Sequence, residues 1–583
     1  MAQSVRPILW SACVALLAGW GCEQVIGADF DEKALLQPGT GGSGGTGGTS
    51  GGGGVGGSGH PLGHPCVNGT ECGSGICADE VCCDSECEGD CQQCDLEGSE
   101  GTCSPYEVLT PCGSAPPGVC DGSGACATGA PIWNDRFGGG GEDLAKACAF
   151  DAAGELYVVG EFHGTLDLGG DLLDPTLFGQ RKVFIAKVGR DGAHRWSAML
   201  DSDGEIYVND VAVDSDGGVA IIGNFDDAID IGGELLQHSG PGPWSGFILK
   251  LNGDGAHLWS TVIKSPLLGA EQEIAIDASG NVVAAGLYSD PVEIDGVSRS
   301  SGGDYGTFIA RFESDGTLAW LDTNTTVIGA PRSGPSGIQI GSTGDLFVLG
   351  FWRAGDIAFG GETLVNADAI GQDVFLVRMD PEGNVIWANR YGANASQFAG
   401  GLAIDGQDRL GFVGSFNATI NFGSGSLTNL SATGNNVIVE LDVFAGMVDE
   451  DATHLWSEPY GTFFSDKRLW TRVGSDQVGN LALIGRTEAQ PVDMGNGSLP
   501  ATSLDGAFFS RVGVDGTTLW SKAFDASGTG TEGERMKLMH VASAPDGTTA
   551  VCGWLAGETD LGTGTLTSDP GGSKDILIGT FEP

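Results

Sequence analysis

The sequence predicts an all-β fold, a seven-bladed β-propeller closed by its own N-terminal strand, and three observations support this prediction. Tryptophan recurs at intervals of 61 to 69 residues, and a fixed period of this size is typical of stacked or radial repeats. Each interval carries four short apolar runs separated by turns. The apolar run at the start of the repeat region matches the fourth run of a repeat, and the last repeat has no fourth run of its own. The recurring residues are Trp133, Trp196, Trp259, Trp320, Trp387, Trp456 and Trp520.

The third repeat shows the elements in order. Residues 273–286 hold two apolar runs separated by a Gly-containing turn, which predicts a β-hairpin of buried strands. A third run covers 305–312, the acidic-Gly turn Asp315-Gly316 follows it, and a fourth run begins at Trp320. We name these strands a, b, c and d from the axis outward. Four-stranded sheets of this kind bury both faces when they pack radially, as in β-propellers.

The two ends of the repeat region predict how the ring closes. Residues 131–137 match a d strand, and residues 575–583 match a c strand. Each strand type occurs seven times only if the first d strand completes the last blade. We therefore expect these segments to pair antiparallel, which protects the edges of that sheet. A linear solenoid would instead need distinct capping repeats, and we recognise none in the sequence.

The segments before the repeats give the expected domain order: a lipoprotein signal peptide (1–21), a lipid attachment site with a flexible tether (22–60), a disulfide-rich module (61–130) and the propeller (131–583). The apolar run from Ile8 to Trp20 is too short to span a bilayer. Small residues before Cys22 resemble a bacterial lipoprotein signal, in which Cys22 is lipidated, although Gly19 stands where such signals usually have Leu. The alternative is an ordinary secreted protein. Residues 39–59 are almost entirely Gly, Ser and Thr, which predicts a disordered linker.

Twelve cysteines in a short, loop-rich and exported segment predict six disulfides. The alternative is a metal site, because Cys91 and Cys94 have zinc-like spacing and two histidines lie nearby. We favour disulfides, with separate partners for the vicinal Cys82 and Cys83. The cysteines of this module are Cys66, Cys72, Cys77, Cys82, Cys83, Cys87, Cys91, Cys94, Cys103, Cys112, Cys120 and Cys126.

Two further cysteines, Cys148 and Cys552, fall in the first and last repeats. Cys148 occupies the position that holds an apolar residue in other a strands. The two repeats are neighbours in a closed ring, so a disulfide across the closure is one interpretation. We favour the other, in which both are buried and act as small apolar residues.

The charge balance limits the partners. The chain has 27 Lys and Arg against 77 Asp and Glu, a formal net charge of −50. Such a chain repels nucleic acid phosphates, so no nucleic-acid partner is expected, and contact with a membrane is expected through the lipid anchor only. We expect a monomer whose partner is a protein or glycan of the envelope or of another cell.

An acidic residue recurs just after the b strands, on the side where propellers usually bind ligands. Such a ring could attract a basic partner or a cation, with calcium as the candidate. The alternative, which we favour, is a recurring turn whose carboxylate caps backbone N–H groups. No other metal or cofactor site is predicted, and no residues are identified as catalytic. The residues of this acidic ring are Asp167, Asp230, Glu293, Asp493 and Asp560.

The repeat resembles bacterial propeller repeats of the SBBP type and, more loosely, NHL and PQQ-like repeats, on the residues 277–286, 304–312 and 315–320. The layout of signal, Gly/Ser tether, a module like 77–87 and repeats is similar to that of surface lipoproteins of myxobacteria. The resemblance implies the fold and an outer-membrane location, at the cell surface or on the periplasmic face. It implies no settled activity.

The sequence therefore predicts a non-enzymatic, membrane-anchored propeller that acts in binding, adhesion or envelope scaffolding. The alternative is a periplasmic or surface enzyme, a hydrolase or quinoprotein, with an axial site that the sequence does not reveal.

Overall fold

The computed structural model describes residues 60–583 except 73, 75, 86, 88–90, 97–98, 107–110, 113–117, 121–125, 176–179, 234, 267, 367–370, 394, 431–440, 465–470, 488–490, 501, 529–530, 532–533 and 570–572. The chain divides into two units, 1–56 and 57–583. The predicted signal peptide, the lipidation site Cys22 and the tether up to residue 59 lie outside the described residues.

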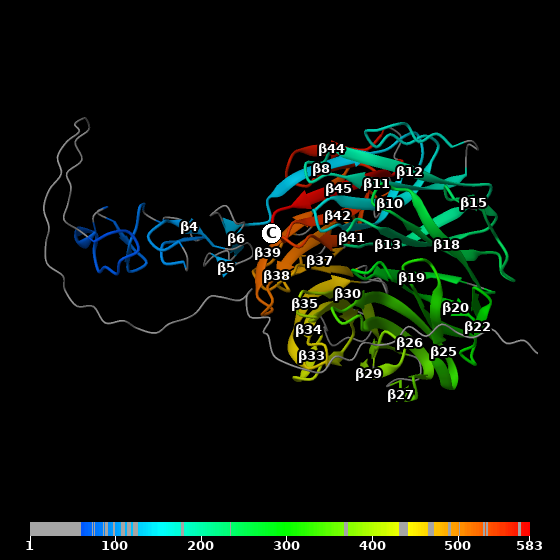
Figure 1. Ribbon diagram of the computed structural model, residues 1–583. Helices are drawn as coiled ribbons and strands as arrows, with labels where there is room; N and C mark the ends of the chain where they lie inside the picture. Colours follow the sequence, from blue (N-terminus) through cyan, green and yellow to red (C-terminus); the bar gives the residue numbers. More distant parts are fainter. Residues whose placement is uncertain are drawn as a thin grey trace, which may run out of the picture. The chain divides into compact units, whose positions relative to one another are not determined.

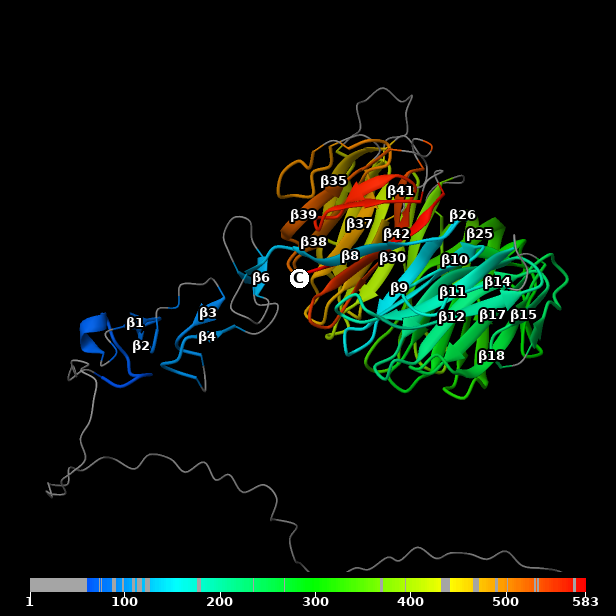
Figure 2. The same ribbon diagram turned by 90° about the horizontal axis from the view of Figure 1, so that it is seen from above.

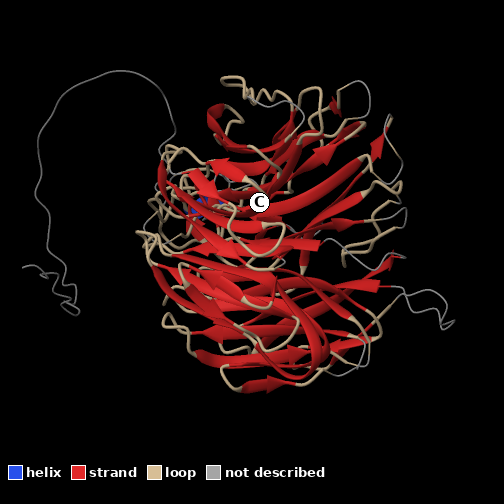
Figure 3. Ribbon diagram, turned by 90° about the vertical axis from the view of Figure 1, so that its right-hand side faces the viewer, coloured by secondary structure: helices blue, strands red, loops and turns tan. Residues whose placement is uncertain are grey.

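The described residues are almost entirely strands and loops, with one short 3₁₀-helix at Gly69–Glu71 (Figure 3). In this part of the chain no helix has the length and hydropathy that a bilayer crossing requires. The all-β prediction is confirmed.

Among the described residues, the repeat region forms seven antiparallel sheets with a core of four strands each (Figure 1). Rim strands extend three of these sheets. From the inner strand outward, the first three sheets are β9 (Leu144–Phe150), β10 (Leu156–His163), β11 (Arg181–Val188) and β12 (His194–Ser202); β13 (Ile206–Val213), β14 (Val219–Phe225), β17 (Ser245–Leu251) and β18 (His257–Lys264); and β19 (Leu268–Ile276), β20 (Val282–Ser289), β23 (Tyr305–Phe312) and β24 (Leu318–Thr323).

The next four sheets are β25 (Thr325–Ile340), β26 (Leu346–Phe359), β28 (Gln372–Met379) and β29 (Val385–Tyr391); β30 (Gln397–Ile404), β31 (Leu410–Phe416), β34 (Leu441–Val448) and β35 (His454–Phe464); β36 (Thr471–Ser475), β37 (Leu481–Arg486), β38 (Ala507–Val512) and β39 (Thr518–Phe524); and β41 (Met536–Ser543), β42 (Thr549–Leu555), β45 (Asp575–Phe581) and β8 (Pro131–Phe137). We call the sheets blades one to seven in this order.

The inner strands close a ring. Each contacts the inner strand of the next blade, in the order β9, β13, β19, β25, β30, β36, β41 and back to β9. Seven apolar clusters fill the ring, and each draws its residues mainly from two neighbouring blades. Burial of both faces of each sheet therefore requires the neighbours, as expected for radial repeats.

The strand β8 completes the last sheet, as predicted from the ends of the repeat region. It pairs antiparallel with β45, from Ile576 opposite Phe137 to Phe581 opposite Pro131. The cyan β8 lies at the edge of this sheet, beside the red β45, in Figure 1, and Figure 2 shows the same sheet from above. Beyond the strands, the Glu582 N–H donates to the Ala130 carbonyl at 2.8 Å, which extends the same pairing.

The recurring tryptophans link neighbouring blades. Each lies on a d strand, and six of the seven donate their indole N–H to a carbonyl at the c–d turn, or its equivalent, of the next blade. Trp456 differs, because its Nε1 is buried and has no hydrogen-bond partner among the described residues. The six bonds, 2.9 to 3.2 Å long, run from Trp133 to Arg190, Trp196 to Gly253, Trp259 to Ser314, Trp320 to Pro381, Trp387 to Glu450 and Trp520 to Pro583.

The acidic-Gly turn is shaped by the same contact. Gly316 has φ +89°, and a Cβ placed there would lie 2.7 Å from Cγ of Trp259. Glycine is therefore required both by the left-handed backbone and by the indole that packs on it. The period of the sequence arises because one side chain and one turn must meet at every blade interface.

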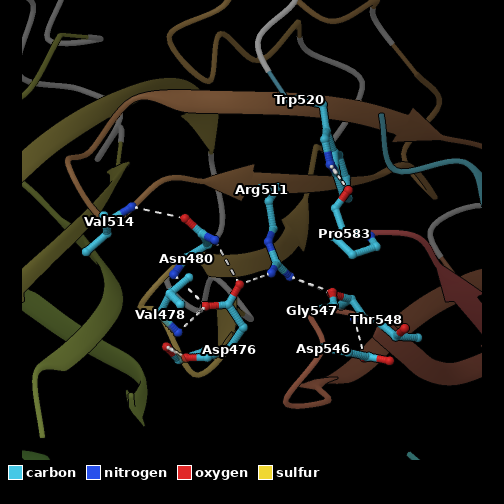
Figure 4. A network of polar contacts seen from close by, with 12 residues as sticks. Asp476, Val478, Asn480, Arg511, Val514, Trp520, Asp546, Gly547, Thr548 and Pro583 are labelled. Atoms are coloured by element: carbon cyan, nitrogen blue, oxygen red, sulfur yellow. Dashed lines mark hydrogen bonds and ion pairs between the residues drawn. The ribbon is translucent and has the colours of Figure 1, made fainter. Parts of the chain in front are cut away.

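A buried ion pair within blade six also contacts blade seven (Figure 4). Arg511 and Asp476 are both fully buried at their side chains, and Arg511 also donates to the Gly547 carbonyl at 3.1 Å. Asp476 in turn accepts the backbone N–H of Val478 at 3.0 Å and of Asn480 at 2.9 Å. These bonds offset part of the cost of burying both charges, because burial still lowers the pKa of Arg511. Gly547 belongs to the following blade, so the network links blades six and seven.

The segments that join b to c strands reach the outer rim. Hairpin β15 (Ala228–Asp230) and β16 (Leu235–Gln237) pairs with β12 of the preceding blade, and β21 (Val292–Ile294) with β22 (Val297–Arg299) pairs with β18 in the same way. The remaining strands of this rim are β27 (Glu362–Leu364), β32 (Thr419–Asn421), β33 (Ser426–Thr428), β40 (Ala526–Ser527), β43 (Glu558–Asp560) and β44 (Thr565–Thr567).

The cysteine-rich module is held by the six disulfides that the sequence predicts, and Cys82 and Cys83 have separate partners. The bonds are Cys66–Cys77, Cys72–Cys82, Cys83–Cys94, Cys87–Cys103, Cys91–Cys120 and Cys112–Cys126. Its strands are β1 (Cys77–Ala78), β2 (Val81–Cys82), β3 (Gln92–Gln93), β4 (Ser104–Pro105), β5 (Pro111–Cys112), β6 (Gly118–Cys120) and β7 (Cys126–Ala127).

A seventh disulfide joins Cys148 of β9 to Cys552 of β42. The interpretation favoured from sequence, two separate buried cysteines, was wrong. Both side chains are fully buried at the interface of blades one and seven, as that interpretation required. Ring closure, however, brings their Cα atoms to 6.5 Å, within reach of a disulfide, which a residue-type argument alone does not reveal.

Candidate functional site

The inner strands share one position at which the residue type changes from blade to blade. Each b strand has a recurring glycine, such as Gly223, and the residue before it pairs with the inner-strand position in question. Asp210 pairs with Ile222 in this way, and His540 pairs with Cys552. We call these seven residues the axial belt: Ala147, Asp210, Glu273, Gly337, Gly401, Arg472 and His540.

Six residues of the axial belt line one cavity of about 360 Å³, bounded by the inner strands of all seven blades. This volume lies in the range of small-molecule sites, ~300–1,000 Å³. Its ionisable side chains are divided by blade: Asp210 and Glu273 come from blades two and three, and Arg472 and His540 from blades six and seven. The glycines of blades four and five add no side chains, so the cavity is polarised across the axis.

The acidic side holds two carboxylates that are difficult to ionise together. Asp210 is 8% exposed, and its oxygens accept the N–H groups of Val211 at 2.8 Å and Ile274 at 3.0 Å. Burial, and then the charge of Glu273, raise the pKa of Asp210 well above its usual range. Burial also raises the pKa of Glu273, against the opposite influence of Arg472. The pair therefore favours a cationic or hydrogen-bond-donating group.

The basic side combines a guanidinium with a neutral imidazole. Arg472 donates to the Gly400 carbonyl at 2.7 Å, which fixes it beside the cavity. Burial, and then the charge of Arg472, lower the pKa of His540 to about 3. His540 Nε2 lies 4.0 Å from Asp210 Oδ1, and a quarter of its side chain remains exposed to the cavity. The imidazole is therefore uncharged at neutral pH.

Lys537 lies on the same strand as His540, three residues before it. Burial, and then the nearby Arg472, lower the pKa of Lys537 to about 7. The positive charge on this side of the ring is therefore mainly that of the Arg472 guanidinium, although the whole chain is strongly acidic. This contrast favours ligands with separated charges.

The arrangement is suited to binding more than to covalent catalysis. A nucleophile needs a base within hydrogen-bonding distance and an orienting group beyond it. Here both Asp210 oxygens are engaged by backbone N–H groups, and Nδ1 of His540 has no hydrogen-bond partner among the described residues. The nearest thiols, Cys148 and Cys552, are joined in a disulfide.

The acidic ring predicted from sequence lies elsewhere. Asp230 pairs across to Asp201 of the preceding blade, and Glu293 forms an ion pair of 3.0 Å with Lys264. The four aspartates accept the N–H of the glycine two residues on, at 2.7 to 2.9 Å, which is the capping geometry of the favoured alternative. None of the five residues lines the axial cavity. Cation binding by Asp167, Asp230, Glu293, Asp493 and Asp560 stays a prediction.

Sequence reasoning missed the axial belt, although a signal was present. Alignment of the repeats on the buried residues Val211, Ile274 and Val473 would have placed a charged residue immediately before each of them. Charge at one fixed position of a buried strand is unusual and indicates a function beyond packing.

Comparison with known proteins finds only distant similarity. No protein-family model matches the sequence. An uncharacterized WD repeat-containing protein of Acanthamoeba polyphaga mimivirus is 28% identical over 211 residues, which cover 30% of this chain and 15% of that protein. The matched part is therefore a small fraction of that relative's length.

Solved structures similar to this chain include two propeller proteins. The Neurospora crassa Pan2 WD40 domain has 11% identity and a TM-score of 0.34, with 76% of this chain and 90% of that chain covered. The structure of YCF48 bound to D1 peptide has 11% identity and a TM-score of 0.32, with 78% and 97% covered. The chain described here is a β-propeller protein with similarity to WD-repeat proteins.

Proposed function

We propose that this chain is an exported, lipid-anchored binding protein that recognises an envelope protein through its axial belt, without catalysis. The observation that carries the proposal is the polarised cavity, in which Asp210 and Glu273 lie on other blades than Arg472 and His540. A peptide terminus or side-chain pair with separated charges complements such a site. Glycan recognition by the same belt is an outcome of the test below.

Export is supported by the cysteines. All fourteen cysteines among the described residues are in disulfides, which persist in oxidising compartments. The residues before Cys22 supply the signal and the anchor. In the producing cell, Cys22→Ser should move the protein from the membrane fraction to the soluble fraction, and unchanged fractionation would refute lipidation.

The binding experiment uses the full chain carrying Cys22→Ser as bait in envelope extracts. We expect the variant Asp210→Asn/Glu273→Gln to lose most of the captured partner. The matched control, Asp230→Asn/Asp493→Asn, removes the same charge from the outer rim and keeps an oxygen to cap each turn, so it should retain capture. Equal retention by both variants, or loss in the control alone, would contradict recognition at the axial belt.

An axial enzyme remains the second candidate, because four ionisable side chains meet at one cavity. Incubation of envelope extract with wild-type protein and with His540→Gln distinguishes it. New small products that require His540 would favour an enzyme, and identical product profiles are expected for a binding protein.

A further inference from the structure

The disulfide at the ring closure lies beside a histidine. One ring nitrogen of His540 and the sulfurs of Cys148 and Cys552 all lie within 4.8 Å of one another. His540 pairs directly with Cys552 across β41 and β42, and Cys148 comes from β9 of the next blade. Two blades therefore place two sulfurs and one imidazole at a single point on the wall of the axial cavity.

The imidazole has a nitrogen available for a ligand. Nδ1 of His540 is buried and makes no hydrogen bond of good geometry among the described residues, which is costly for a polar atom. The backbone of Cys148 lies close enough to the imidazole to act on its pKa. Nε2 faces Asp210 Oδ1 at 4.0 Å. A histidine that binds metal commonly directs its other nitrogen to a carboxylate, which fixes its orientation. The Asp210 carboxylate is the group that Nε2 faces, and the two must move closer than 4.0 Å for Asp210 to take that role.

We propose that, when the Cys148–Cys552 disulfide is reduced, the two thiolates and Nδ1 of His540 bind one thiophilic metal ion such as Zn²⁺. Two sulfurs and one imidazole are ligands that Zn²⁺ accepts in a tetrahedral site. Three protein ligands leave a fourth position open, and Cys148 and His540 both line the cavity, so this position faces the axial belt. The interface of blades one and seven is then held either by a disulfide or by a metal ion.

The steps balance with a phosphine as reductant. The phosphine takes an oxygen atom from water and becomes a phosphine oxide, and the disulfide gains two electrons and two protons to give two thiols. Binding of Zn²⁺ then releases the two thiol protons to solvent. A small-molecule disulfide reverses the change: it accepts two electrons from the two thiolates and leaves as two thiolates of its own. The restored Cys148–Cys552 disulfide then expels the ion, because it offers no thiolate.

The experiment compares two proteins that carry the same twelve module cysteines, so zinc bound by the module is the same in both. Full-length Cys22→Ser protein is reduced anaerobically with a phosphine, equilibrated with Zn²⁺, desalted and analysed for zinc per chain. The variant Cys148→Ser/Cys552→Ser retains all twelve module cysteines, so we expect it to hold one zinc fewer than the parent. Equal zinc contents would overturn the proposal.

A second measurement does not depend on the double variant's folding. Competition with a chromophoric chelator measures the zinc affinity of reduced His540→Gln, which keeps both cysteines. We expect the affinity of one site to fall at least tenfold, whereas His257→Gln on the outer rim should leave it unchanged. An unchanged affinity in His540→Gln, or equal loss in both variants, would show that the imidazole is not a ligand.

Discussion

The tryptophan that links each blade to the next can be tested by a comparison built into the repeats. Trp259 and Trp456 are both 8% exposed and occupy equivalent positions. Trp259 donates to the Ser314 carbonyl at 3.1 Å, whereas Nε1 of Trp456 is buried without a partner among the described residues. Replacement of either by Phe removes a similar volume, so the difference between the two variants isolates the hydrogen bond.

The expected magnitude follows from the two environments. Trp259→Phe loses a hydrogen bond with a net worth of ~1 kcal/mol, and the carbonyl of the exposed Ser314 is then left to water. Trp456→Phe removes a buried donor whose desolvation is uncompensated, which offsets part of its packing loss. We therefore expect Trp259→Phe to lower the free energy of unfolding by roughly 1–3 kcal/mol more than Trp456→Phe does.

Equilibrium unfolding in urea, monitored by tryptophan fluorescence and circular dichroism, supplies the measurement. The Ala variants at both positions control for packing and should each cost about 3–5 kcal/mol. Equal destabilisation by the two Phe variants, or a greater loss at Trp456, would refute the argument that the indole N–H helps to join the blades.

Three further predictions concern buried groups. Cys148→Ala/Cys552→Ala should lower the free energy of unfolding in urea. The loss should be at most ~6 kcal/mol, the chain-entropy value for a sequence separation of 404 residues, and it should be smaller because β8 also closes the ring. No loss would mean that the disulfide contributes nothing to closure. Burial raises the pKa of Asp143 to about 6, so the folded state binds the proton more tightly, and stability should fall by ~3 kcal/mol as pH rises from about 4 through 6. Asp143→Asn should remove this part of the pH dependence, and parallel pH profiles for both proteins would contradict it. Arg511→Met should cost ~3–5 kcal/mol in urea unfolding, because it leaves the Asp476 carboxylate buried without its cation, and addition of Asp476→Asn should recover part of that loss.

The fold was predictable because each blade repeats the same physical requirements. A glycine must pack beneath an indole at each blade interface, as Gly316 packs beneath Trp259. The two residue types therefore recur with the period of the blades even where other residues differ. Closure by β8 was predictable because the last repeat lacks a d strand and the first repeat is preceded by an extra one. The extra strand, β8, pairs with β45 of the last blade. The rim hairpins were not predictable, because their pairing with the preceding blade depends on neighbours in space.

The axial site was less accessible to sequence reasoning. The four ionisable residues of the axial belt lie far apart in the sequence, and only the closed ring brings them to one cavity. The gaps between consecutive members are 63, 199 and 68 residues for Asp210, Glu273, Arg472 and His540. The acidic ring was conspicuous because it recurs in phase with the repeat, yet recurrence is the mark of a structural turn. A binding site in a repeat protein is instead found where the repeat is broken.

Peptide mapping without reduction tests the covalently closed ring most directly. Protein purified from the envelope is treated with a thiol-alkylating reagent under denaturing conditions, digested, and analysed by mass spectrometry. The structure predicts one cross-linked pair of peptides that contain Cys148 and Cys552, with the module's six disulfides intact. Pairing of either cysteine with a module cysteine would contradict the ring closure described here.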